Sequence, residues 1–185
     1  MKSELSRIVL FGMAAGVIAT VLMDIFVAIA MIAMGNPVAF MFIFIGEVAA
    51  KFFSLLNITV PGGPGLGLLF HYLFGMGYGG LFCWALSKWP RFKPAVLSRT
   101  ILLGILYIEI FSQPFLASAP LVLRLSTSDT LQWYGLSTVM HAVYGAVLGL
   151  LEYYRKTILA GLPAAQIREI HAAKTRTQRQ KSLRS

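Results

Sequence analysis

Charged residues are scarce in this sequence, and acidic residues are the scarcest of them. Only 12% of its 185 residues are Asp, Glu, Lys or Arg, and Asp and Glu together number 7. In soluble domains about a quarter of the residues are charged, and disordered chains contain few apolar residues. Here 57% of the residues are hydrophobic and the mean hydropathy is +0.74. The composition therefore excludes an ordinary soluble domain and a disordered chain.

Cysteine is also almost absent. Cys83 is the single cysteine, so an intrachain disulfide and a thiolate-rich zinc site are both excluded. It lies inside an apolar run, as a small buried hydrophobic residue does. The first apolar run, residues 8–34, is longer than the core of a signal peptide and contains no small-residue cleavage pattern. We therefore expect it to be a retained membrane span.

Long apolar segments are what the sequence does contain. About 20 apolar residues in a helix cross a bilayer core, and four segments reach that length: 8–34, 65–86, 100–120 and 131–154. They predict an all-α fold, a transmembrane four-helix domain over residues 1–157 followed by a basic tail, residues 158–185.

A fifth apolar stretch, residues 38–56, contains Glu47 and Lys51. Their four-residue spacing favours an ion pair within a helix. We interpret this stretch as an external helix, either interfacial or re-entrant.

The distribution of basic residues predicts the orientation. With four spans, every Lys and Arg except Lys51 and Arg124 falls on one side of the membrane, and this side is the cytoplasmic one by the positive-inside rule. We therefore expect an integral protein of the plasma (inner) membrane with both termini cytoplasmic. The basic tail suits contact with anionic lipid headgroups, and it lacks the interleaved aromatic residues of a nucleic-acid surface.

Glycines recur at four-residue spacing in three of the predicted spans. Such residues share one helix face, and small residues let membrane helices approach closely. We expect packing seams at six of them: Gly12, Gly16, Gly75, Gly79, Gly145 and Gly149. The pattern His-x-x-aromatic-Gly-x-x-x-Gly occurs at residues 71–79 and again 70 residues later, at 141–149. This repetition suggests two repeated helical hairpins.

Each predicted span also carries strongly polar residues in its outer half, namely Asp24, His71, Glu109, Gln113 and His141. Ionisable groups in lipid are costly unless they face the bundle interior and find partners. We therefore expect the two carboxylates and the two histidines to point toward one another.

Three interpretations of this cluster are open. In the first, interhelical hydrogen bonds only hold the bundle together. In the second, the cluster gates the movement of protons or a small solute, because histidine titrates near neutrality. In the third, His71 and His141 hold a metal ion or a haem in a membrane redox protein, although the Glu-x-x-His pairs of di-metal bundles are missing.

No motif surrounds a candidate nucleophile, so the sequence favours a non-enzymatic channel, carrier or assembly subunit, alone, as a homo-oligomer or in a larger membrane complex. Pro114 and Pro120 are expected to break the end of the third span. Arg124 follows on the external side, where it suits either a lipid headgroup or an anion at the mouth of the bundle.

Several short stretches resemble small four-span prokaryotic integral membrane protein families of unknown function. They are residues 16–24, the His71-Tyr72 pair, the Gln113-Pro114 pair and residues 137–145. The resemblance implies a four-span fold with no established activity, and it transfers no catalytic residues to this chain.

Overall fold

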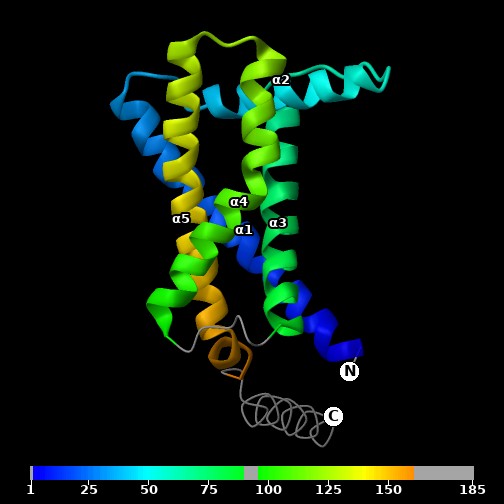
Figure 1. The fold of residues 1–185 in the computed structure, drawn as a ribbon, viewed down its shortest axis with the longest axis vertical. Coiled ribbons are helices and arrows are strands. Elements are labelled where there is room, and N and C mark those ends of the chain that lie inside the picture. Colours follow the sequence, from blue (N-terminus) through cyan, green and yellow to red (C-terminus); the bar gives the residue numbers. More distant parts are fainter. Residues whose placement is uncertain (1, 90–95, 161–185) are drawn as a thin grey trace, which may run out of the picture. The chain divides into compact units, whose positions relative to one another are not determined.

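The computed structural model describes residues 2–89 and 96–160 (Figure 1). The described part of the chain is helical and contains no strand, which confirms the all-α prediction. Its helices are α1 (Lys2–Ala33), α2 (Phe40–Leu55), α3 (Pro64–Lys88), α4 (Leu97–Leu123) and α5 (Thr127–Ala160). Arg91, Lys93 and most of the predicted basic tail lie outside the described residues.

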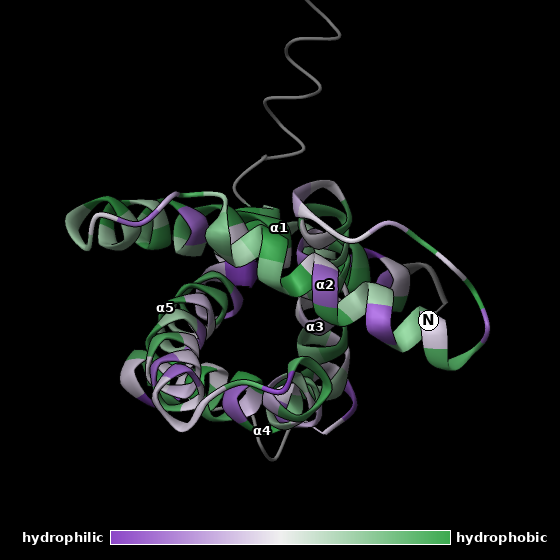
Figure 2. Cartoon of the chain, turned by 90° about the horizontal axis from the view of Figure 1, so that it is seen from above, coloured by the Kyte–Doolittle hydropathy of each residue, from purple (hydrophilic) through white to green (hydrophobic). Residues whose placement is uncertain are grey.

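Four of these helices, α1, α3, α4 and α5, are long and apolar enough to cross a membrane, as predicted. Large apolar side chains such as Ile29, Leu69, Leu102 and Ile110 are exposed along them, which suits a lipid environment. Seen end-on, the four helices surround a common centre (Figure 2).

The chain divides into two compact units, Met1–Tyr153 and Tyr154–Ser185. The first unit contains α1 to α4 and most of α5. Of the second unit, the structure describes only residues 154–160, which end α5.

Helix α2 lies across the end of the bundle that is farther from the N-terminus (Figure 1). It is one continuous helix of 16 residues, and therefore about 24 Å long at 1.5 Å per residue, too short to span a bilayer core. Its buried face holds Met41 and Ile45. Gly46 packs against the backbone of Gly63, whose φ of 98° turns the chain into α3.

The ion pair expected between Glu47 and Lys51 does not form. Both side chains are exposed, and the ion pair that joins two spans is His71–Asp24. The Glu47 carboxylate lies against Gly62 instead, in the space that a Cβ there would occupy. An exposed ion pair gains little from charge attraction and loses side-chain entropy, so a Glu47–Lys51 pair would add little stability.

Close glycine contacts join the spans in pairs. A Cβ on Gly16 would overlap the carbonyl oxygen of Gly75, and one on Gly79 would overlap that of Gly12, so α1 and α3 meet along this seam. In the same way a Cβ on Gly149 would overlap the Thr100 carbonyl oxygen, and one on Gly145 would meet Gly104. All six glycines singled out in the sequence lie in these two seams, with Gly104 as an added member.

The expectation that Pro114 and Pro120 break the third span is wrong, because α4 continues through both to Leu123. Proline lacks an N–H, so Pro120 leaves the carbonyl four residues earlier, at Leu116, without its helical donor. The indole Nε1 of Trp133 on α5 donates to this Leu116 carbonyl at 3.1 Å. A neighbouring helix thus replaces the missing hydrogen bond, which is how membrane helices tolerate internal proline.

Candidate functional site: an intramembrane histidine cavity

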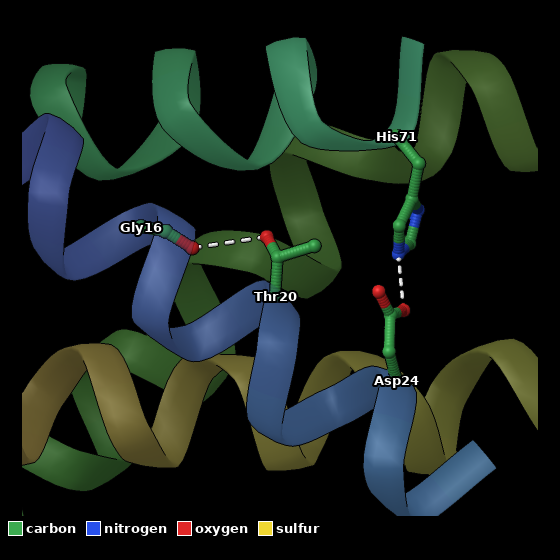
Figure 3. A network of polar contacts seen from close by, with 4 residues as sticks. All are labelled: Gly16, Thr20, Asp24 and His71. Carbon is green, nitrogen blue, oxygen red and sulfur yellow. Dashed lines mark hydrogen bonds and ion pairs between the residues drawn. The ribbon is translucent and has the colours of Figure 1, made fainter. Parts of the chain in front are cut away.

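His71 on α3 is held by a carboxylate on α1. Its Nε2 donates to Oδ1 of Asp24 at 2.8 Å (Figure 3). Asp24 follows Thr20 and Gly16 at four-residue steps, so it shares their face of α1, the one turned toward α3. The two side chains are 12% and 18% exposed for His71 and Asp24, so the pair is largely shielded.

His141 on α5 is held by a hydroxyl on α4. Its Nδ1 lies 3.0 Å from Oγ of Ser112, which is buried. Ser112 is not among the polar residues that the sequence singled out. Serine is common in membrane helices, and nothing within the third span alone marks this one.

The position of Ser112 follows from an internal repeat. In α4, Gly104 and Ser112 each lie 88 residues after Gly16 and Asp24 in α1. In both hairpins the glycine packs on the second helix and the residue eight later holds the histidine. Ser112 is therefore the counterpart of Asp24, with a hydroxyl in place of the carboxylate.

The second helices of the two hairpins repeat at 70 residues rather than 88. The difference of 18 residues lies between the two helices of the first hairpin, where the chain forms α2, a helix of 16 residues. Despite this insertion, the contacts between α1 and α3 follow the same register as those between α4 and α5. The repeat suggested by nine residues of sequence thus extends to all four spans and to the histidine partners.

Both histidines line one cavity of about 80 Å³. A water molecule occupies about 30 Å³ in the liquid, so the cavity suits two or three waters or one small group. All five helices contribute to its wall. Its polar lining consists of Thr20, His71, Tyr78, Ser112, Ser137, His141 and Tyr144, and its remaining lining is apolar apart from Trp133 and Gly75.

Each histidine keeps one ring nitrogen open. No hydrogen bond joins His71 Nδ1 or His141 Nε2 to another described residue. Within the described part of the chain, Oε1 of Glu109 is the only side-chain nitrogen or oxygen that is both buried and without a partner. The two open nitrogens are therefore not fully buried, and both histidines line the cavity.

A wider vestibule adjoins the cavity at the α2 end of the bundle. Its volume is about 380 Å³, and Met41 and Trp133 line both spaces. The vestibule also carries polar side chains, Asn36, Asp129 and Gln132. Met41 and Trp133 thus separate the histidine cavity from a polar opening.

Tyrosine hydroxyls bridge the helices along the cavity wall and beyond it. Tyr144 on α5 donates to the Gly75 carbonyl of α3. Tyr107 on α4 donates to the Tyr78 carbonyl at 2.9 Å, and Tyr78 donates to the Phe111 carbonyl at 3.3 Å. Farther from α2, the side chains of Phe82, Cys83 and Leu86 are buried. The cavity therefore ends at this layer.

The structure does not bring together all of the predicted polar cluster. Glu109 does not line the cavity, although its Oε1 is buried. Gln113 and Arg124 are exposed, and neither lines the cavity. Successive helix residues are rotated by about 100°, so Ile108 and Ser112 face the cavity whereas Glu109 and Gln113, one residue on, turn away. The result is two separate histidine pairs rather than one four-way cluster.

One buried carboxylate was missed in the sequence. Glu152 on α5 is fully buried, and Sγ of Cys83 on α3 donates to its Oε2 at 3.2 Å. The available signal was an acidic residue inside the fourth apolar segment. Glu152 lies eleven residues beyond His141, about 16 Å along the helix at 1.5 Å per residue, so it is separate from the histidine cavity.

The described residues do not fit a metal site built from three protein ligands. Among the described residues, no three His, Cys, Asp or Glu side chains gather where they could hold a metal.

No family model, curated protein or solved structure matches this chain.

Proposed function

We propose that this integral membrane protein moves protons or a small polar solute through the histidine cavity. One observation carries the proposal: two histidines from two repeated hairpins line the same small cavity, and each is held at one ring nitrogen while the other has no hydrogen-bond partner among the described residues. Ionisable groups inside a membrane commonly mark such pathways. A purely structural role requires the hydrogen bonds but gives no reason for the two open nitrogens.

The surroundings of the cavity support a gated route. The polar vestibule approaches it from the α2 end, with Met41 and Trp133 between the two spaces. Tyr107 and Tyr144 close the other end through their interhelical hydrogen bonds. Passage requires each closure to open in turn, which is the arrangement of a carrier rather than of an open pore.

The proposed location is the plasma (inner) membrane, with both termini cytoplasmic and α2 external. The one-sided distribution of Lys and Arg supports this orientation. A reporter fused after Ser185 is expected to read as cytoplasmic, and an external reading would overturn the orientation.

Membership of the small four-span prokaryotic families of unknown function is part of the same proposal. Asp24, His71 and His141 belong to the stretches that carry the resemblance, and in this chain they form the two histidine pairs. Contact of the basic tail with anionic headgroups and association into a homo-oligomer or larger complex remain proposals from the sequence.

Proton flux in proteoliposomes tests the function. The wild-type protein is expected to acidify the lumen under an imposed potential, and the His71→Gln/His141→Gln double variant to lose that flux, because glutamine hydrogen-bonds but does not titrate near neutrality. His171→Ala, which removes the third histidine, serves as the matched control. If the double variant carried the same flux of protons and of small polar solutes as the wild-type protein, the histidine pairs would have a structural role only.

A further inference from the structure

An apolar groove runs along the lipid-facing side of the bundle between α3 and α4, with α2 at one end. This lateral groove has a volume of about 560 Å³, and its lining includes Phe52, Leu56, Phe70, Phe74, Phe115 and Ser118. Apart from the Ser118 hydroxyl, which donates to the Phe115 carbonyl in its own helix, these side chains are hydrocarbon. The groove therefore suits an alkyl chain.

The lateral groove leads to the histidine cavity. Phe74 and Phe115 line both spaces, and their ring centroids are 5.7 Å apart. Phe74 lies three residues after His71, and Phe115 three residues after Ser112, so each ring is adjacent to one of the histidine pairs on its helix. Two aromatic rings are thus the partition between the lipid-facing groove and the polar cavity.

Few interactions hold α3 and α4 together at this level. The hydrogen bonds that join the two helices in the described part of the chain involve Tyr78 with Tyr107 and with Phe111. Both lie farther from α2 than the Phe74–Phe115 contact does. Rotation of the two phenylalanine rings can therefore open the partition without breaking an interhelical hydrogen bond.

A second groove shows that an apolar surface alone is not the distinguishing feature. It has a similar volume, about 510 Å³, and its lining includes Leu68, Leu69 and Leu73 on α3. It shares no residue with the histidine cavity. Tyr72 is the polar side chain in its lining, so this second groove can hold an ordinary lipid chain but does not lead to His141 and Ser137.

We propose that the lateral groove and the histidine cavity together bind a membrane amphiphile that has one hydrocarbon chain and a small uncharged oxygen headgroup, a hydroxyl or a carbonyl. The inference rests on the proposed function and names its solute as the headgroup of this amphiphile. The chain lies in the groove, and the headgroup passes between Phe74 and Phe115 into the cavity.

The chemistry of the cavity selects this headgroup. His141 and Ser137 lie four residues apart on the same face of α5, and both line the cavity. Together they can donate to and accept from one oxygen. The charge of Asp24 is already paired with His71, and the cavity lining contains no Lys or Arg that could pair with the phosphate of a phospholipid.

Photolabelling tests the proposal. The full chain in phosphatidylcholine nanodiscs is exposed to a long-chain alcohol with a diazirine in its chain, and labelled peptides are mapped by mass spectrometry. Labels are expected at Phe70, at Phe74 and around residues 114–118, in clear excess over Leu68, Leu69 and Leu73 of the second groove. In the His141→Ala/Ser137→Ala variant, the alcohol concentration that half-saturates this labelling is expected to rise about tenfold or more, because the hydrogen bonds to the headgroup are lost.

Matched tryptophan variants separate the two grooves. Leu56→Trp and Ser118→Trp narrow the lateral groove, whereas Leu69→Trp narrows the second groove; Leu56 and Leu69 are both exposed, at 69% and 55%. The first two variants are expected to suppress labelling and the third to leave it unchanged. Equal labelling of both grooves would show contact with bilayer lipid only and would overturn the proposal. The same conclusion would follow if neither Leu56→Trp nor the His141→Ala/Ser137→Ala variant changed the labelling.

The two proposals fail in different ways. Histidine-dependent proton flux without groove-specific labelling would leave the transport function standing and remove the amphiphile. Groove-specific labelling that competes with unlabelled alcohol, in a protein without histidine-dependent flux, would retain the amphiphile site and remove transport.

Discussion

Nε2 of His71 lies 2.8 Å from Oδ1 of Asp24, across the seam between α3 and α1. The seam is close enough for this bond because glycines line it on both helices. The seam between α4 and α5 repeats the arrangement with His141 and Ser112. In both hairpins, the close glycine contacts therefore account for the packing of the two helices and for the placement of the histidine.

Removing one partner of the His71–Asp24 pair should destabilise the bundle. Asp24→Ala is expected to lower the free energy of unfolding by about 2 kcal/mol, below the range for a fully buried pair because both groups are partly exposed. Thermal unfolding in detergent measures it. In a double-mutant cycle with His71→Ala the two losses should not add; strict additivity would mean that the pair contributes nothing.

The hydroxyl of Ser112 should matter more than a hydroxyl that bonds only within its own helix. Ser112→Ala is expected to cost about 1 kcal/mol, because it removes a hydrogen bond to His141 between α4 and α5. Ser118→Ala, which loses only a bond to the Phe115 carbonyl in the same helix, is the control and should change the melting temperature less. The reverse order would contradict the role given to Ser112.

Glycine position should decide the effect of an added methyl group. Gly16→Ala places a Cβ on the Gly75 carbonyl oxygen, and the forced separation of α1 from α3 is expected to cost about 1–3 kcal/mol. Gly77 lies in the same helix as Gly75 but faces open space, so Gly77→Ala should be neutral or stabilise by up to about 1 kcal/mol. Equal melting temperatures for the two variants would refute the seam.

The indole of Trp133 should stabilise α4 by completing its hydrogen bonding. Trp133→Phe leaves the Leu116 carbonyl without a donor, since Pro120 cannot supply one, and an unsatisfied buried acceptor costs about 1–3 kcal/mol. Trp89, which is 54% exposed, provides the control as Trp89→Phe. Adding Pro120→Ala to Trp133→Phe should restore part of the stability, and no recovery would argue against this explanation.

Much of the fold was predictable because it depends on local properties of the sequence. Apolar length identifies the four spans, and glycine spacing identifies the faces along which they pack. The limits were also local: the prolines suggested an end to the third span, but a tryptophan on another helix compensates for Pro120. Glu109 was expected in the polar cluster because of its depth alone, and its rotation about α4 turns it away from the cavity.

By itself the sequence determined the helical class and the number of spans, since hydrophobic length fixes these without knowledge of neighbours. Only the tertiary structure decided which polar residues meet. His71 finds Asp24, His141 finds Ser112, and Glu109 finds no partner. Those pairings depend on the register and rotation of helices far apart in the chain, and the close glycine contacts set both.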